Sequence, residues 1–337
     1  MSFKRLDPED ISISAESVVA PLWSTDLKYL TTFHTSSGQV ASNTGNYFYE
    51  IYENNPAGTT PSNVQFAIAF GDKTGRGATA YNNGAPNNSP SSTIYGQYRN
   101  LVFGDEEQGF TFSTFESDYV YVINVDRARY KEKLLPGSFN LKLQNSSGDV
   151  LELTDNSKDI TTVSYVDAGR VYDIVSGSDG SAYTGLGHSP VYGSYGKFLP
   201  DVGVIVLNGT ALQQSANGGG INLGTTFVGD GTDLNLNKLY NVIKLGASSS
   251  LQSEETISSN FVFVRVRNSE FNYSTNPSNI TSSGELRHDV MINTPQAYIT
   301  TVGLYNDNND LLGVAKLSRP LLKDFTKEAL VRIKLDY

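Results

Sequence analysis

Apolar and polar residues alternate with a period of two along much of this chain, a pattern that predicts β-strands. In the run FNLKL, the apolar side chains Phe139, Leu141 and Leu143 share one face of the strand. The turn formers NSSGD and the run VLEL follow, which predicts a β-hairpin. The same reasoning predicts further strands at residues 47–52, 64–70, 110–115, 119–125, 202–207 and 261–267.

Helical spacing is rare in the same pattern. One helix is predicted at residues 234–245, where apolar side chains recur at Leu236, Leu239, Tyr240 and Ile243. Near the end of the chain, two apolar runs flank the turn Asn306–Asp310, which predicts a second hairpin. We predict a short helix from Pro320 to Ala329, and then a strictly alternating strand over residues 331–337.

The distribution of turn formers predicts the domain organisation. Residues 71–92 are rich in Gly, Asn, Ser and Pro and are predicted to form a long exposed loop or a strap between subunits. The residue composition changes near residue 154, after which the chain is predicted to form loops rich in Gly, Ser and Tyr. We predict a mainly β protein with two or three sandwich-like domains, an extended arm, long loops and few short helices. The predicted parts are an arm at 1–35, a domain at 36–153, an inserted or second domain at 154–255 with the helix, and a C-terminal unit at 256–337 that completes the first domain's sheet.

Charge narrows the possible partners. The formal net charge of −10 argues against a general nucleic-acid binder. Residues 313–337 nevertheless carry six Lys and Arg against three Asp and Glu, a net +3, so the rest of the chain carries −13. This basic end could pair head to tail with another acidic subunit, or it could be a solvated face.

Several kinds of site are excluded by residue type. The chain has no cysteine, which excludes disulfides, thiol catalysis and Cys-based metal sites. Its three histidines lie far apart in sequence and predict neither a zinc site nor a catalytic triad, and we expect no cofactor. The turn at 306–310 starts like a calcium loop, but Leu311 and Leu317 replace the glycine and the acid that such a loop needs. A hairpin turn explains it better.

Catalytic motifs are weak. Ser194 and Lys197 fit S-x-x-K, and residues 73–75 read KTG, a pair used by penicillin-recognising enzymes. Here the KTG precedes the serine and both lie in Gly-rich loops, which indicates coincidence. Asp105, Glu106 and Glu107 could supply glycosidase carboxylates, but three acids after a glycine are more typical of a solvated turn. We predict that the chain is not an enzyme.

The stretch TTVGLYNDNNDLLGVAKLSRP, residues 300–320, resembles the "GLY-turn-LLAVAKLSKP" hairpin of tail-fibre and baseplate proteins of tailed bacteriophages. Residues 94–105, residues 264–278 and the opening MSFKRLDPEDISIS are similar to virion proteins of large contractile-tailed phages. The resemblance implies a structural subunit of the virion, in the baseplate or the adjacent tail or neck region, with no catalytic residues to carry over.

The prediction therefore places the chain in a virion assembled in the host cytoplasm. The N-terminus lacks an apolar signal core and no apolar run is long enough to span a membrane, so we expect a soluble product. The expected partners are other virion structural proteins and copies of the chain itself, with no nucleic acid and no membrane insertion.

Two alternatives stay open: a receptor- or carbohydrate-binding tail module that contacts host surface glycans through tyrosines in residues 176–197, and a polysaccharide depolymerase. Trp23, the only tryptophan, packs either on its own domain or in a neighbour. The candidate residues of a subunit interface are Phe3, Leu22, Trp23, Arg265, Arg267, Arg332, Lys334 and Tyr337.

Overall fold

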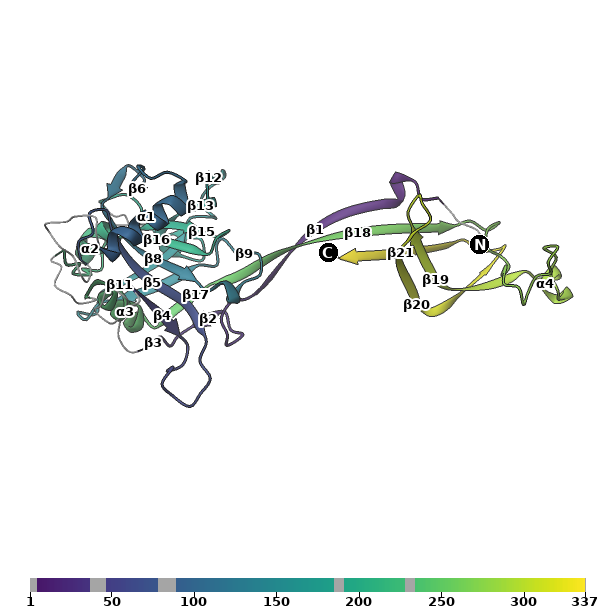
Figure 1. The fold of residues 1–337 in the computed structure, drawn as a ribbon, viewed down its shortest axis with the longest axis horizontal. Coiled ribbons are helices and arrows are strands. Elements are labelled where there is room, and N and C mark those ends of the chain that lie inside the picture. Colours follow the sequence, from purple (N-terminus) through teal and green to yellow (C-terminus); the bar gives the residue numbers. More distant parts are fainter. Residues whose placement is uncertain (1–4, 37–46, 78–88, 185–190, 228–233, 337) are drawn as a thin grey trace. The chain divides into compact units, whose positions relative to one another are not determined.

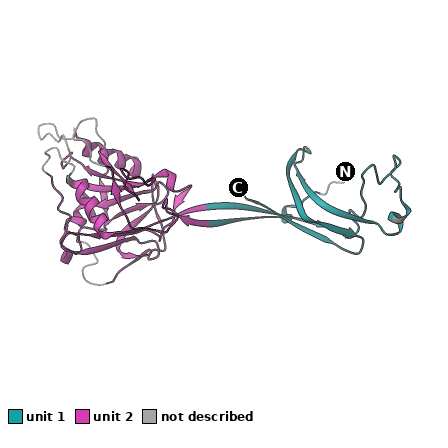
Figure 2. Cartoon of the chain, turned by 90° about the horizontal axis from the view of Figure 1, so that it is seen from below, with its two compact units in different colours: residues 1–17, 256–337 teal, residues 18–255 magenta. Residues whose placement is uncertain are grey.

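The chain divides into two compact units. Unit 1 comprises residues 1–17 and 256–337, and unit 2 comprises residues 18–255 (Figure 2). With 44% strand and 15% helix, the fold is mainly β, which confirms the predicted fold class. The computed structural model describes residues 5–36, 47–77, 89–184, 191–227 and 234–336.

Unit 2 is built on a large antiparallel sheet, which has 13 strands over the described residues (Figure 1). Its order is β2-β17-β10-β11-β13-β15-β16-β8-β5-β4-β3, and β12 and β14 pair with β13 beside this path. The strands are β2 (Tyr29–Leu30), β3 (His34–Thr35), β4 (Phe48–Tyr52), β5 (Val64–Asp72), β8 (Tyr119–Val125), β10 (Asn140–Gln144), β11 (Val150–Asp155), β12 (Ser164–Val166), β13 (Gly169–Ser178), β14 (Ser181–Ala182), β15 (Gly196–Leu199), β16 (Val204–Asn208) and β17 (Ser248–Ser250).

Smaller elements complete unit 2. The predicted strand at 110–115 is instead a short hairpin, in which Phe112 pairs with Phe115. The short strand β9 pairs with the part of β18 that belongs to unit 2. These elements are β6 (Phe110–Phe112), β7 (Phe115–Ser117), β9 (Lys133–Leu134), α1 (Pro90–Phe103), α2 (Gly209–Gln213), α3 (Leu234–Gly246), and the 3₁₀ turns η2 (Arg127–Arg129) and η3 (Ala216–Gly218).

Strand β8 shows how both faces of the sheet are covered. Every residue of β8 except Asn124 is buried. Tyr121 belongs to the apolar cluster that contains Leu239 of α3, whereas Val122 belongs to a second cluster that contains Tyr95 of α1. Successive side chains of a strand point to opposite faces, so β8 contributes to two cores.

The predicted boundary between residues 153 and 154 is wrong. It falls inside β11, which pairs with β10 on one edge and with β13 on the other. Residues 154–255 supply β13, β15 and β16 to the sheet that residues 36–153 began, so the two ranges form one unit. The change in residue composition marks loops between strands of one sheet.

Helix α3 confirms the predicted helix at 234–245, but α1 was not predicted. Its boundary signals are in the sequence, since Ser89 is the N-cap, Pro90 occupies the first turn and Gly104 ends the helix at φ 64°. The helix packs on β5 at Gly71, where a Cβ atom would lie 2.9 Å from the amide nitrogen of Tyr95. The loop predicted at 71–92 thus ends in a helix, and residues 78–88 lie outside the described residues.

Unit 1 contains a sheet and a separate hairpin. Strand β1 (Ile11–Pro21) pairs with β18 (Gln252–Val266), and β18 pairs on its other edge with β21 (Ala329–Asp336). The unit boundaries fall within β1 and β18, so the predicted arm at 1–35 is divided between the two units. The hairpin pairs β19 with β20, and the remaining elements are η1 (Pro8–Asp10), α4 (Asp289–Asn293), β19 (Gln296–Tyr305) and β20 (Leu311–Asp324).

One face of the β18–β21 pair carries the core of unit 1. Val262 lies opposite Ile333, and Val264 lies opposite Val331. This inner face packs with side chains of the hairpin and of the N-terminal segment: Leu6, Val302, Leu304, Ala315 and Leu317. The alternation in residues 331–336 confirms the predicted final strand.

Two predictions for the end of the chain are wrong. The helix predicted from Pro320 to Ala329 is absent: β20 runs to Asp324, a turn follows, and β21 begins at Ala329. Pro320 is tolerated because residues 317–320 form a bulge opposite Thr300, where its missing N–H interrupts no ladder bond. Strand β21 pairs with β18, so the C-terminal unit does not complete the sheet of unit 2.

Candidate subunit interface

Two of the candidate interface residues are core residues of unit 2. Leu22 is 2% exposed and Trp23 is 3% exposed. The Trp23 ring lies 6.1 Å from the ring of Phe66, and its Nε1 donates a hydrogen bond to the Lys28 carbonyl oxygen at 3.0 Å. Both side chains are therefore occupied within their own unit, and the reading in which they contact a neighbour is wrong. Phe3 and Tyr337 lie outside the described residues.

Three of the other candidates gather on the outer face of the β18–β21 pair, opposite the core of unit 1. Arg265, Arg332 and Lys334 are all exposed. Their cross-strand partners are Leu330, Phe263 and Phe261, in that order. We call these six residues the outer face of unit 1: Phe261, Phe263, Arg265, Leu330, Arg332 and Lys334. Arg267 follows the end of β18, and its amide nitrogen donates to Glu270 Oε2 at 2.9 Å.

The outer face combines cations with aromatic rings. The Arg332 guanidinium lies 5.1 Å and the Lys334 Nζ 5.9 Å from the centroid of the Phe261 ring. Arg265 Nη2 pairs with Glu328 Oε2 at 2.7 Å, which raises the pKa of the guanidinium through that hydrogen bond. Lys334 pairs with Asp336 at 3.1 Å. Such exposed pairs contribute little to stability.

Sequence reasoning found the cations of this face but missed its apolar members. The signal is the run FVFV at residues 261–264, which is apolar on both faces of the strand. An antiparallel strand with one solvated face is expected to alternate with polar residues. Leu330 is 65% exposed, so the outer face presents apolar surface among its charges.

The burial of apolar side chains differs sharply between the two units. Among the described residues, 47 apolar side chains are buried in unit 2, whereas unit 1 buries only Val262, Val266, Ala329, Val331 and Ile333. Unit 1 nevertheless holds 14 of the 25 large apolar side chains that are exposed. A unit with so few buried apolar groups has little hydrophobic stabilisation of its own.

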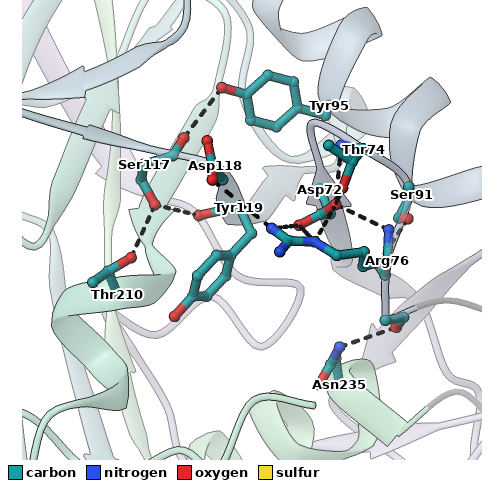
Figure 3. Close-up of polar contacts among 12 residues, drawn as sticks. Asp72, Thr74, Arg76, Ser91, Tyr95, Ser117, Asp118, Tyr119, Thr210 and Asn235 are labelled. Carbon is teal, nitrogen blue, oxygen red and sulfur yellow. Dashed lines mark hydrogen bonds and ion pairs between the residues drawn. The ribbon is translucent and has the colours of Figure 1, made fainter. Parts of the chain in front are cut away.

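The KTG segment forms a structural turn at the end of β5 (Figure 3). The buried Asp72 carboxylate accepts hydrogen bonds from Thr74 N at 3.0 Å, from Thr74 Oγ1 at 2.8 Å and from Arg76 N at 2.9 Å. Arg76 Nη2 donates to the second carboxylate oxygen at 2.9 Å. Ser91 Oγ of α1 donates to the Arg76 carbonyl oxygen at 3.0 Å. The contacts of Asp72 close the turn on itself, and the bond from Ser91 attaches the turn to the helix.

The S-x-x-K residues also bind a carboxylate. Ser194 Oγ donates to Asp173 Oδ1 at 3.3 Å, and Lys197 Nζ lies 3.5 Å from the same oxygen. Lys73 of the KTG segment pairs instead with Glu116 at 3.0 Å. The two motifs therefore bind different carboxylates, and the described residues show no contact between them.

The candidate glycosidase carboxylates and the calcium-like turn also form local structural contacts. Glu107 N donates to Asp105 Oδ1 at 2.7 Å in an exposed turn. Asn306 Oδ1 accepts from the amide nitrogens of Asn308 and Asp310, so the turn at 306–310 is closed by its own side chain, as predicted for a hairpin. No three His, Cys, Asp or Glu among the described residues are placed to hold a metal ion.

An apolar cavity of about 10 Å³ lies in the core of unit 2, lined by Trp23, Phe66, Phe139 and their neighbours. That volume is at the lower limit for a single water molecule and is far too small for an organic ligand. In the part of the chain that the structure describes, no helix is both long enough and apolar enough to cross a membrane.

Asp155 gives unit 2 a predictable response to pH. Its carboxylate is buried, and burial raises its pKa above the usual 3.8 despite hydrogen bonds from Ser157 and Gly137. A raised pKa in the folded state means that the folded chain binds the proton more tightly. The stabilisation is complete below about pH 3.8 and is lost as the pH rises through the folded pKa.

We therefore expect Asp155→Asn, which stays uncharged, to gain stability relative to wild type as the pH rises from 3 to 7. Urea unfolding at several pH values, followed by far-UV circular dichroism, measures the difference. The exposed Asp167→Asn is the control and is expected to run parallel to wild type. A constant difference between wild type and Asp155→Asn across this range would contradict the prediction.

Comparison with known proteins gives no relative for this chain. No protein-family model, no curated protein and no solved structure matches it.

Proposed function

We propose that this chain is a structural subunit of a tailed-phage virion, in the baseplate or the adjacent tail or neck region, and that it works by assembly. The resemblance of residues 300–320 to tail and baseplate proteins suggests the setting. The observation that carries the assembly role is the contrast in unit 1, among the described residues, between five buried apolar side chains and 14 large apolar side chains that are exposed.

The physical argument concerns the stability of unit 1. Conformational entropy opposes the ordering of each residue, and burial of apolar surface is the main term that offsets it. A two-stranded hairpin alone is marginally stable in water. Contact with a neighbouring subunit would bury the apolar side chains that the hairpin now exposes, among them Leu311, Leu312 and Val314. Assembly would then supply the stabilisation that the core of unit 1 lacks.

Mass spectrometry of purified particles tests the proposal. We expect the chain in washed, intact particles at a fixed ratio to the major tail protein, and we expect particles lacking it to be incomplete in the tail. The chain's presence in the infected-cell lysate but absence from purified particles would exclude the proposed function.

The glycan-binding alternative gains no support from the described part of residues 176–197. Tyr195 is fully buried, Tyr183 donates to Glu152 Oε2 at 2.7 Å, and Tyr192 packs edge to face on Phe115 at 5.0 Å. These three tyrosines do not form the exposed cluster that a stacking platform for sugars requires, so we retain assembly as the proposed function.

A further inference from the structure

The outer face of unit 1 has the character of a surface that another protein covers. Strand β18 is apolar on both sides at residues 261–264, which is typical of strands covered on both faces. Strand β21 lies beside β18 (Figure 1) and adds Leu330, Arg332 and Lys334 to this face. Aromatic and arginine side chains together are enriched where proteins bind one another. The three cations of this face exceed the two carboxylates that pair with them, Glu328 and Asp336, which leaves a net +1 and favours an acidic partner.

An acidic surface of suitable character lies on unit 2 of this same chain. Unit 2 carries 14 Lys and Arg against 23 Asp and Glu, which accounts for −9 of the net charge of −10. Asp105, Glu106 and Glu107 are exposed together in the turn after α1. A fourth carboxylate adjoins them, because a Cβ atom on Gly109 would meet Glu116 Oε1. We call these four acidic residues the acidic turn.

Three of the four carboxylates in the acidic turn lie outside the ion pairs of the described residues, and an exposed apolar side chain lies near them. Among the ion pairs of the described residues, only Glu116 of this turn takes part, through Lys73. Leu101 of α1 is 43% exposed one turn before Asp105. The turn thus offers carboxylates to the cations and an apolar side chain to Leu330, which matches the composition of the outer face.

We propose that the outer face of unit 1 binds the acidic turn of unit 2 in a second copy of this chain. The contact joins two different surfaces, so it is head to tail and generates a ring or a filament. The inference names the partner for the assembly role proposed above and rests on it. Electrostatic attraction between exposed charges makes the association sensitive to salt.

Charge reversal on the full-length chain tests the contact. One variant carries Arg332→Glu and Lys334→Glu, and the other carries Glu106→Lys and Glu107→Lys. Sedimentation velocity over a range of concentrations measures self-association in 50 mM and 500 mM NaCl. We expect wild type to self-associate and to weaken in high salt, and each double variant to bind itself at least about tenfold more weakly.

Mixing the two variants is the decisive step. The reversed, acidic outer face of the Arg332/Lys334 variant then meets the reversed, basic turn of the Glu106/Glu107 variant. The other two surfaces in the mixture are wild type. We expect the mixture to recover the association that each variant lost alone, which a misfolded variant could not do. Lys316→Glu, an exposed change of the same sign on β20, is the matched control and is expected to associate like wild type.

The inference would be overturned by a wild-type chain that is monomeric at every concentration in low salt, by variants that associate like wild type, or by a mixture without recovery. Loss of association in the Arg332/Lys334 variant alone would also overturn it, because the outer face would then bind a surface of the second copy other than the acidic turn. Presence of the chain in purified particles is measured separately, so the inference can fail while the proposed function stands.

Discussion

Replacing Trp23 with alanine is expected to lower the free energy of unfolding of unit 2 by about 3–5 kcal/mol. The indole is almost fully buried among Leu22, Phe66 and the neighbouring core, and it already borders a cavity of about 10 Å³. Truncation would enlarge that cavity and leave the Lys28 carbonyl oxygen without its donor. Urea unfolding followed by far-UV circular dichroism measures the loss.

The exposed Leu27→Ala is the matched control for this change, since it removes a nearby apolar side chain from the surface. We expect it to shift stability by less than about 0.5 kcal/mol. A Trp23→Ala chain that unfolds at the wild-type urea concentration but self-associates more weakly would contradict the prediction. That outcome would mean that the indole packs in a neighbouring subunit.

Replacing Asp72 with alanine is expected to cost about 3 kcal/mol, because it removes a buried, charged hydrogen-bond acceptor whose ion-pair partner Arg76 is partly exposed. The carboxylate is inaccessible to solvent, and it holds the amide nitrogens of Thr74 and Arg76 as well as the Arg76 guanidinium. Without it the amide nitrogens of Thr74 and Arg76 lose that acceptor inside the turn, whereas the Arg76 guanidinium keeps its ion pair with Asp118 at 3.9 Å. Thermal unfolding of the full chain gives the size of the effect.

Asp72→Asn separates hydrogen bonding from charge. Its side-chain oxygen can still accept from the amide nitrogens of the turn. We therefore expect the stability of Asp72→Asn to lie between that of wild type and that of Asp72→Ala. Lys73→Ala, at the neighbouring partly exposed position, removes one surface ion pair with Glu116 and is expected to cost less than about 1 kcal/mol. Equal effects of Asp72→Ala and Lys73→Ala would show that the buried carboxylate has no special role.

The hydrophobic pattern predicted individual strands well because a strand's period is local. The predicted strand at 119–125 matches β8, and the predicted run at 64–70 lies within β5. Their lack of polar alternation reflects apolar clusters on both faces of the sheet. Pairing is not local, however: β8 lies between β5 and β16, and no pattern in either run identifies its neighbour.

This difference explains the error in the domains. The loops rich in Gly and Ser after residue 154 suggested a new domain, but hydrogen bonding across β11 continues the sheet. The predicted boundary at 256 matches the structure, since unit 1 resumes at Thr256. It was not predicted that residues 1–17 belong with this late segment, because long-range contacts unite them: the pairing of β1 with β18 and the packing of Leu6 on the core of unit 1.

The helix errors have separate physical causes. Residues 90–103 form α1 although Ser, Thr, Gly and Asn weaken the helical pattern, and the caps at Ser89 and Gly104 define its ends. Residues 320–329 show helical spacing and a proline that suits a first turn. Pairing of β20 with β19 overrides that local preference, because Pro320 sits in a bulge.

The candidate interface was predicted in part. Charge and alternation identified Arg265, Arg332 and Lys334, which the structure brings together on one face. Burial could not be predicted from a single tryptophan near a proline, so the packing of Trp23 was left open between its own domain and a neighbour, and the structure shows its own unit. Phe263 was overlooked because an aromatic residue in an alternating strand is usually a core residue.

The nesting of unit 2 within unit 1 has a consequence for the order of folding during synthesis. The 230 residues from 22 to 251 separate β1 from β18, its partner. At ribosomal rates these residues take about 10–50 seconds to make. During that interval unit 2 can complete its sheet, while β1 waits with an unpaired edge. Unit 1 therefore forms last, which delays the exposure of a finished docking surface until the rest of the chain has folded.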